Sequence, residues 1–310
     1  MTISFKVSDN VKKKIIAYYE DMKFEKTPPY AEFQVKDFDC VTTLYESGKI
    51  VFQGIGADIE ASIWIEQERR LNNRIIDVTG KEKEKDKKDK DKDIQIMYST
   101  IGSDEVGTGD FFGPIVVSAA YVSKEKINFL IDLGVRDSKK LTDDKIIKIA
   151  PSIIKEIPHS TIVLDNKSYN ANHSSDVNMN KIKAILHNKV LLNLVKDDKY
   201  DYKSIVVDQF AFPKKYYSYI ADVKEKVTGI YFMTKAEDKC FSVAAASIIS
   251  RYVFLSEMKK LSDQIGFEIP KGAGPLVDEV AKTIVEKHGY NKLNEIAKMN
   301  FKNATKLKEA

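Results

Sequence analysis

The chain has 310 residues, 43% hydrophobic and 31% charged, a composition typical of globular proteins that fold in water. This length allows one large domain or two ordinary ones, and no uninterrupted apolar run reaches the roughly 20 residues that a membrane helix needs, so we expect no membrane partner. The formal net charge of +4 is compatible with a polyanionic partner but does not require one.

The first residues and the cysteines favour a cytoplasmic location. The segment MTISFKVSDN lacks a basic start followed by an apolar core, so it is not predicted to be a secretory signal. Cys40 and Cys240 are far apart in the chain, and we expect both to be small apolar residues in a reducing compartment.

A charged stretch divides the chain. Residues 81–93, KEKEKDKKDKDKD, contain no apolar residue, and their seven lysines and six acids leave a net charge of only +1. Such a segment cannot bury surface, so a solvated spacer is favoured over a basic nucleic-acid tail. The predicted organisation is a domain over 1–80, a linker over 81–94 and a domain over 95–310.

The first domain is predicted to be a small α+β unit. Ser8 is a candidate N-cap for a helix whose apolar residues recur at helical spacing. Strands are expected at Tyr30–Val35, Val41–Tyr45 and Ile50–Phe52, the last two joined by a turn at Ser47-Gly48. A second helix then carries Trp64, which is expected in the core.

The second domain alternates strands with helices, which predicts an α/β fold with a central sheet covered on both faces. The expected strands are Met97–Ile101, Ile115–Val122, Thr161–Leu164, Ser204–Val207 and Ile230–Met233. The expected helices are 143–154, 176–195 and 243–255.

Carboxylates follow three of these strands: Asp104-Glu105, Asp208 and Glu237-Asp238. A single acid at a strand end is ordinary surface, but sites collect at strand ends in α/β sheets. Two ionised carboxylates about 4 Å apart repel by roughly 4 kcal/mol at an effective dielectric near 20, so a protein gathers four only around cations. Oxygen ligands favour Mg²⁺ or Mn²⁺, and two such ions are the arrangement that hydrolyses phosphodiesters.

Glycines directly after the first acidic pair indicate a bulky ligand. Gly107-Thr108-Gly109 lets backbone N–H groups and a hydroxyl approach a sugar–phosphate chain. The four histidines, His159, His173, His187 and His288, have no metal-ligand spacing and are expected at solvated or helix-surface positions.

Four ordered segments resemble the prokaryotic type 2 ribonucleases H. They are GSDEVGTGDFFGPIVVSAAYV (102–122), DSKKLTDDKI (137–146), IVVDQF (205–210) and TKAEDKCFSVAAASIISRY (234–252). The resemblance implies a ribonuclease-H-like mixed central sheet with flanking helices. It also implies cleavage of the RNA strand of RNA–DNA hybrids with two Mg²⁺ or Mn²⁺ ions, leaving 5′-phosphate and 3′-hydroxyl ends.

The first domain indicates a branch of that family. TTLYESGKIVFQG (42–54) resembles a half-repeat of the TATA-box-binding protein, and an appended domain of this kind is the mark of the ribonuclease HIII branch. Gly272-Ala273-Gly274 stands where ribonuclease HII carries a Gly-Tyr-Gly motif that senses DNA–RNA junctions. Inefficient cutting at a single embedded ribonucleotide is therefore expected.

Carried over by motif, the catalytic and metal-binding residues are Asp104, Glu105, Asp208 and Glu237, with Asp238 as the alternative fourth acid. Ser103, Gly107, Thr108 and Gly109 are expected at the RNA 2′-hydroxyls. Lys139 and Lys140 are candidates for phosphate contacts or for structural pairing with an acid. The first domain is expected to bind the hybrid through Thr43, Tyr45, Ser47 and Lys49.

Two alternatives stay open: an architectural nucleic-acid binder with a degenerate nuclease fold, and another two-metal phosphoryl hydrolase. The intact acidic set argues against the first. No obligate protein partner is implied, and a monomer is expected.

Overall fold

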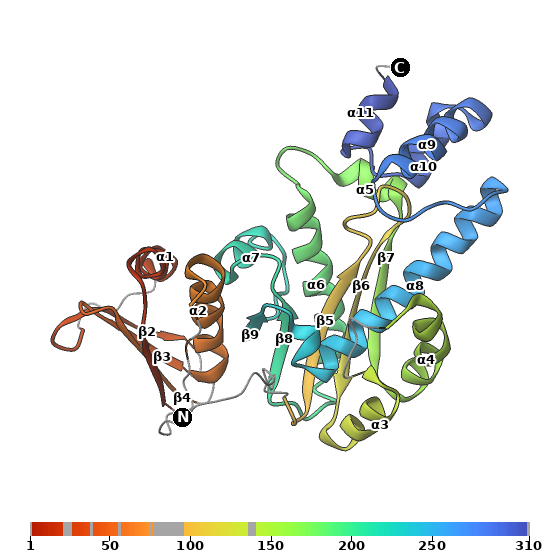
Figure 1. The fold of residues 1–310 in the computed structure, drawn as a ribbon. Helices are drawn as coiled ribbons and strands as arrows, with labels where there is room; N and C mark the ends of the chain where they lie inside the picture. Colours follow the sequence, from red (N-terminus) through yellow and green to blue (C-terminus); the bar gives the residue numbers. More distant parts are fainter. Residues whose placement is uncertain are drawn as a thin grey trace, which may run out of the picture. The chain divides into compact units, whose positions relative to one another are not determined.

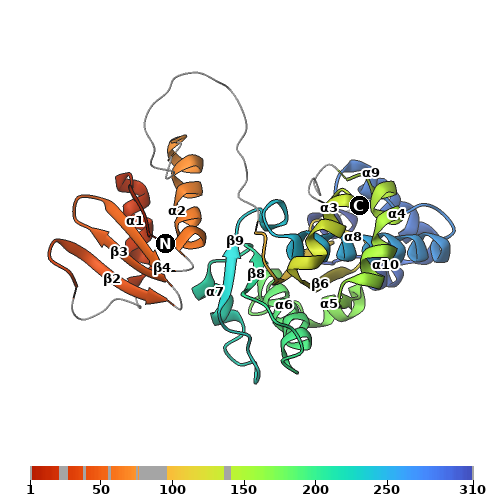
Figure 2. The same cartoon turned by 90° about the horizontal axis from the view of Figure 1, so that it is seen from below.

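The structure is a computed structural model that describes residues 2–20, 27–37, 40–54, 57–74, 76, 96–135 and 141–308. The chain forms two compact units, Met1–Lys92 and Asp93–Ala310, and each has a sheet of its own (Figures 1 and 2). The predicted linker over 81–94 lies outside the described residues.

The first unit is a four-stranded antiparallel sheet with two helices. Its elements are β1 (Thr2–Lys6), α1 (Asp9–Tyr18), β2 (Ala31–Asp37), β3 (Cys40–Tyr45), β4 (Lys49–Gly54) and α2 (Ala57–Asn72), with strand order β1-β4-β3-β2. The sequence did not predict β1, which pairs with β4 at the edge of the sheet. Both helices bury residues against one face of the sheet, and Trp64 is in that core as predicted.

The second unit contains the larger sheet and most of the helices. Its strands are β5 (Thr100–Val106), β6 (Ile115–Val122), β7 (His159–Leu164), β8 (Ser204–Asp208) and β9 (Ile230–Met233). Its α-helices are α3 (Ile127–Asp132), α4 (Asp143–Glu156), α5 (Asn166–Asn172), α6 (Met179–Val195), α7 (Pro213–Tyr219), α8 (Phe241–Ile265), α9 (Pro275–His288), α10 (Tyr290–Ile296) and α11 (Lys302–Lys308). Two 3₁₀ segments, η2 (Lys124–Lys126) and η4 (Ala236–Asp238), complete the described part.

The five strands of the larger sheet lie in the order β7-β6-β5-β8-β9. β5 pairs antiparallel with β6 and parallel with β8, while β8 and β9 are also parallel, so the predicted mixed sheet is confirmed. Helix α6 packs on one face and α8 on the other, and α4 packs against α8 on that second side (Figure 1).

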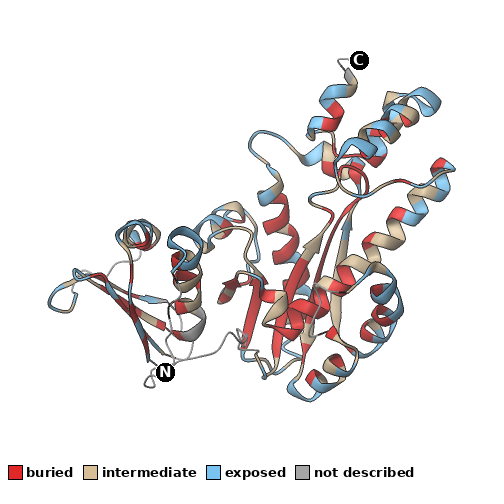
Figure 3. Ribbon diagram, in the orientation of Figure 1, coloured by how far each residue is buried: buried red, intermediate tan, exposed pale blue. Residues whose placement is uncertain are grey.

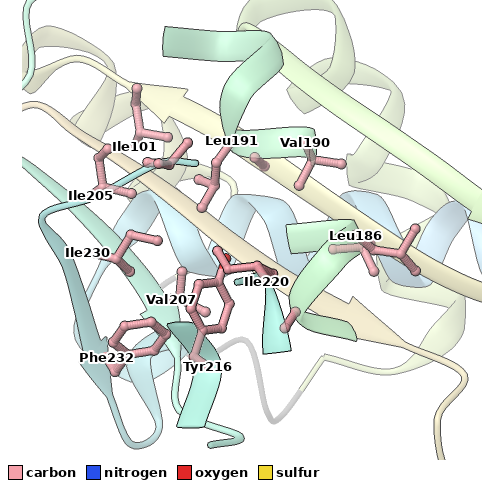
Figure 4. Close-up of a cluster of buried hydrophobic side chains, with 14 of the residues drawn as sticks. Ile101, Leu186, Val190, Leu191, Ile205, Val207, Tyr216, Ile220, Ile230 and Phe232 are labelled. Atoms are coloured by element: carbon pink, nitrogen blue, oxygen red, sulfur yellow. The ribbon is translucent and has the colours of Figure 1, made fainter. Parts of the chain in front are cut away.

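Apolar cores fill both interfaces of this sheet. One lies between the strands and helices α6 and α7, where Leu191, Val207 and Tyr216 are fully buried (Figure 4). The other joins the opposite face to α8, α4 and α3. Burial is concentrated in the strands and in the helix surfaces that face them (Figure 3), as expected for a sheet covered on both sides.

The first strand of this unit differs from its prediction. It begins at Thr100 and continues through Asp104 and Glu105 to Val106, whereas the sequence indicated a strand from Met97 to Ile101 with the acids beyond its end. Asp104 pairs with Ser118 and Glu105 with Val117 in the ladder to β6. Strand propensity misplaced the boundary because pairing with β6 holds these two acids, which disfavour strands in isolation.

Helix α8 meets the length and composition criteria for a membrane span, although no uninterrupted apolar run predicted one. It is the single such helix among the described residues, and 61% of its most apolar window is buried within the protein. Its apolar residues pack against the sheet, as those of a core helix do.

Close contact between α8 and β5 depends on Gly102. A Cβ at this position would lie 2.4 Å from the backbone nitrogen of Val243 and 2.5 Å from the hydroxyl of Ser242. Neither a backbone atom nor a fully buried serine can yield without moving the helix, so only glycine fits here.

We predict that Gly102→Ala destabilises the second unit by about 3 kcal/mol, because overpacking typically costs 1–3 kcal/mol and the clash here is with backbone. Urea unfolding followed by circular dichroism measures the change. Gly109→Ala is the matched control, since a Cβ there meets nothing within 4 Å. Equal stability of the two variants would contradict this account of the helix contact.

Candidate active site

Two carboxylates meet because β5 and β8 run parallel. Ser103 pairs with Val207 in this ladder, so the next residues, Asp104 and Asp208, come at the same end of neighbouring strands. Side chains alternate between the two faces of a strand, and Gly102 lies against α8, so Asp104 also points toward α8. A hydrogen bond between its carboxyl group and Ser247 of α8 agrees with that direction.

Asp208 and Glu237 complete this side of the sheet. Asp208 accepts a hydrogen bond from the backbone N–H of Ala236 at 2.9 Å. The same turn carries Glu237, whose side chain hydrogen-bonds to the Asp208 carboxyl group and repels its charged form. Glu237, rather than its neighbour Asp238, is therefore the acid that meets the strand-end carboxylates.

Burial and mutual repulsion raise the pKa of two of these acids. Burial raises the pKa of Asp104 well above its ordinary value, and the nearby Glu105 and Asp208 raise it further. Burial, together with Glu237 and Glu105, raises the pKa of Asp208 to about 6, against the opposing hydrogen bond from Ala236. This face of the sheet thus concentrates negative charge at a buried position.

Glu105 points to the opposite face, where α6 supplies two cationic or donating side chains. One of its carboxylate oxygens pairs with the Lys183 ammonium, and the other lies 2.8 Å from Nε2 of His187. Burial alone would raise the pKa of Glu105, but the hydrogen bond and charge of His187, joined by Lys183, lower it to about 2. Glu105 is held as a carboxylate.

The two side chains that bind Glu105 also contact Ser103 and Phe210. Nδ1 of His187 lies 2.8 Å from the Ser103 hydroxyl. The Lys183 ammonium lies 4.1 Å from the centre of the Phe210 ring, and the His187 ring stacks on the same ring at 5.2 Å. These contacts fix both α6 side chains from two directions.

Lys183 was not predicted from the sequence, and His187 lies elsewhere than expected. His187 is 0% exposed, so the expected solvated position was wrong. The available signal was two polar residues four positions apart in one helix, which places both on one face. The Ser103 side chain is fully buried, and its hydroxyl lies against His187.

The glycine segment follows Glu105 closely. Gly107 has φ +95°, and a Cβ there would lie 2.1 Å from the carbonyl oxygen of Pro114, so glycine is required on two grounds. Thr108 is half-buried and Gly109 is exposed, which leaves this part of the turn accessible to a ligand.

The predicted contacts in the first unit have mixed exposure. Ser47 and Lys49 are exposed and Tyr45 is half-buried. Thr43 is buried, and its hydroxyl accepts a hydrogen bond from the Gln34 side-chain amide at 3.0 Å. Lys139 and Lys140 lie outside the described residues.

A cavity of about 270 Å³ adjoins the carboxylates. Its lining includes Glu237, Ser247 and Arg251, and it is otherwise formed mainly by apolar side chains. Asp143 holds the Arg251 guanidinium with bonds of 2.9 and 3.1 Å. The cavity brings a fixed positive group to the same side of the sheet as the acids.

The donor set fits hard divalent cations. Carboxylate oxygens are the preferred ligands of Mg²⁺ and Mn²⁺, and a positive ion would relieve the repulsion that raises the pKa values of Asp104 and Asp208. Among the residues that the structure describes, no three His, Cys, Asp or Glu side chains converge as ligands of one ion.

Comparison with known proteins identifies the family. The family model described as Ribonuclease HII matches residues 101–304, which include all four carboxylates. Ribonuclease HIII of Bacillus pumilus is 44% identical over 303 residues, covering 97% of this chain and 96% of that protein. The chain belongs to the ribonuclease HIII family.

Further relatives agree with this assignment. Ribonuclease HIII of Bacillus subtilis is 43% identical over 283 residues, covering 90% of this chain and 88% of that protein. The crystal structure of Bst-RNase HIII in complex with Mn²⁺ matches with a TM-score of 0.68 at 38% identity, covering 100% of this chain and 98% of the other. The predicted ribonuclease-H-like fold is thereby confirmed, and this member of the family is a ribonuclease H enzyme.

The first unit has a family match of its own. Residues 2–74 match a model described only as a domain of unknown function, DUF3378. The ribonuclease H2 from Pyrococcus horikoshii OT3 matches 68% of this chain and 97% of its own, with a TM-score of 0.56 and 28% identity. The family match to ribonuclease HII is thus confined to the second unit, and the first unit is matched separately.

We predict that the metal-free protein becomes less stable as the pH rises from about 4 to 7. Asp208 has a pKa of about 6 when folded, so the native state binds its proton more tightly than the unfolded chain and loses that advantage as the pH rises through 6. The loss is on the order of 3 kcal/mol. Thermal unfolding in EDTA measures it, and Asp208→Asn should flatten the profile. An unchanged slope in that variant would refute the assignment.

Proposed function

We propose that the protein is an endoribonuclease that hydrolyses the RNA strand of RNA–DNA hybrids with two divalent cations, Mg²⁺ or Mn²⁺, leaving 5′-phosphate and 3′-hydroxyl ends. The observation that carries the proposal is the cluster of Asp104, Asp208 and Glu237 on one side of the sheet, with Glu105 at the adjoining position. The Mn²⁺ complex of the related Bst-RNase HIII supports the choice of ion.

These four acids would hold the ions. Bound divalent cations would supply an activated water and stabilise the charge of the leaving oxygen. The chain's own contribution is placement: the β5–β8 pairing sets Asp104 beside Asp208, and the Ala236 N–H orients the Asp208 carboxyl group. Lys183 and His187 keep Glu105 ionised and fixed.

Substrate choice is proposed to depend on the segment after Glu105. Thr108 and Gly109 can approach a ribose closely because neither is fully buried and Gly109 has no side chain. The 2′-hydroxyl both donates and accepts hydrogen bonds, and it is the group that separates RNA from DNA. Gly107 fixes the turn that presents them.

The first unit is proposed to bind the hybrid backbone through the face of its sheet that α1 and α2 leave uncovered. Tyr45, Lys49 and Lys6 share one row of that face, because Lys6 pairs with Lys49 and neighbouring strands align the same side. The ammonium groups of Lys6 and Lys49 can pair with backbone phosphates. Such contacts do not depend on the base sequence of the hybrid.

We further propose that the protein acts as a monomer in the cytoplasm. Both cysteines, Cys40 and Cys240, are buried free thiols, which suits a reducing compartment. Analytical ultracentrifugation of the purified chain would test the monomeric state.

We predict that Asp104→Asn lowers kcat on an RNA–DNA hybrid on the order of 10³-fold or more. The asparagine amide cannot serve as a charged metal ligand, although it has the same shape as the aspartate side chain. It also removes the repulsion of Asp104 by Glu105 and Asp208. The variant should therefore fold with at least wild-type thermal stability in EDTA and bind the hybrid with near wild-type affinity. Near wild-type turnover would end the assignment of Asp104.

A substrate panel separates the proposal from its alternatives. Labelled RNA–DNA hybrid, duplex DNA, single-stranded RNA and DNA with one embedded ribonucleotide are incubated with Mg²⁺, Mn²⁺ or EDTA. Metal-dependent cutting of the hybrid alone supports the proposal. Cutting of duplex DNA would favour another phosphoryl hydrolase, and binding without cutting would favour an architectural role.

We predict that Lys49→Ala weakens binding of the hybrid in EDTA and lowers the slope of log K against log salt by about one, because one phosphate contact is lost. Fluorescence anisotropy across a salt series measures both quantities. Lys13→Ala is the matched control, since Lys13 is an exposed lysine on α1, whose buried side faces the other surface of the sheet. Identical slopes in the two variants would exclude the proposed face.

A further inference from the structure

Two glycine-containing segments far apart in the sequence lie side by side in the second unit. The backbone N–H of Phe111 donates to the carbonyl oxygen of Gly272 at 2.8 Å. In the reverse direction, the backbone N–H of Gly272 donates to the Asp110 carboxylate at 2.6 Å. The turn at Gly107–Gly109 is therefore tied to the segment Gly272–Gly274 through the residue that follows it.

A buried lysine holds the same loop from another direction. The Lys298 ammonium donates to the carbonyl oxygens of Asp110 at 2.8 Å and Gly113 at 2.5 Å. The backbone N–H of Lys298 donates to the carbonyl oxygen of Phe111 at 2.8 Å. Residues 110, 111 and 113 thus all hydrogen-bond to one residue near the C-terminus.

Lys298 is a charged side chain in a fully buried position, so its burial depends on the hydrogen bonds that its ammonium group donates. Its side chain is 0% exposed, and burial lowers its pKa to about 7, although Asp110 opposes that shift. A fully buried lysine is rare unless its ammonium has partners. An apolar residue here would remove the donor from the carbonyl groups of Asp110 and Gly113, so the lysine satisfies the loop as well as anchoring it.

The loop has little freedom between these anchors and the acids. Gly107 is only two residues beyond Glu105, and it packs so closely on Pro114 that no Cβ fits. Phe111 and Phe112 are fully buried in the cluster formed with the C-terminal helices. Any shift of the Lys298 anchor must therefore reach the exposed turn at Thr108 and Gly109.

We propose that Lys298 and Asp110 are positioning residues, which hold the turn at Gly107–Gly109 and the segment Gly272–Gly274 as one rigid surface for the RNA strand. The proposal rests on the function proposed above. Neither residue contacts the reacting atoms: Lys298 is fully buried, and Asp110 acts through its hydrogen bond to Gly272.

The test compares Lys298→Met and Asp110→Ala in the full chain with a control of similar structural cost. Leu293→Ala is that control, because Leu293 is fully buried in the same cluster and is apolar. We expect kcat/KM on the RNA–DNA hybrid to fall roughly 10- to 100-fold in the two loop variants, since misplacement by about 1 Å can cost 10²-fold. Leu293→Ala should keep kcat/KM near wild type at a matched loss of Tm.

Two further readouts distinguish positioning from general damage. Isothermal titration with Mn²⁺ should give wild-type affinity in all three variants, because the carboxylates are untouched. Inhibition by duplex DNA should also be unchanged, so that the loss is confined to the RNA-containing substrate.

Several results would overturn the proposal. Wild-type kcat/KM in both loop variants would do so, as would an equal loss in Leu293→Ala. If Lys298→Met does not fold, Asp110→Ala decides alone, because Asp110 is only half-buried and its substitution should be tolerated. Failure of the wild-type chain to cut the hybrid would instead refute the proposed function itself.

Discussion

The parallel pairing of β5 with β8 is the constraint on which the rest of the site depends. It sets Asp104 and Asp208 at the same end of adjacent strands, although they are 104 positions apart in the chain. Gly102 allows a second contact at this position. Because it has no side chain, α8 lies directly on β5, and Ser247 of α8 reaches the Asp104 carboxyl group. The turn before α8 then delivers Glu237 to Asp208.

The alternation of side chains along β5 gives its two adjacent acids different electrostatic surroundings. Asp104 faces α8, where its neighbours include other carboxyl groups, and its pKa is raised. Glu105 faces α6, where Lys183 and His187 lower its pKa. The protein itself therefore compensates the negative charge of Glu105. The carboxyl groups around Asp104 repel one another, so a bound cation would stabilise their charged forms most. The two adjacent acids of β5 therefore differ in how strongly the protein itself compensates their charge.

The C-terminal segments act on the loop that leaves this site. Lys298 and Gly272 both bond to residues 110–113, so elements near the end of the chain set the conformation of a loop that begins two residues beyond Glu105. A loop with three anchors and a glycine at positive φ has few conformations to lose when a ligand binds. Rigid presentation of Thr108 and Gly109 is consistent with discrimination by a single hydroxyl group of the substrate.

The sequence by itself indicated the strands of the larger sheet, helices on both of its faces, and the carboxylates Asp104, Glu105 and Asp208 as the candidates for the chemistry. The mixed strand pairing was implied only by the family resemblance. Apolar periodicity and acids near strand ends are local signals, and they are readable without contacts. The resemblance of four ordered motifs added the family, which the comparisons confirmed.

Only the tertiary structure decided the remaining features, because each depends on partners distant in the chain. β1 is held by its pairing with β4, and the extension of β5 through its acids by pairing with β6. The contact between Glu237 and the Asp208 carboxyl group likewise joins segments that are distant in the chain. The burial of His187, Ser103 and Lys298 depends on packing between segments 84 or more positions apart, which a linear pattern of residue types does not encode.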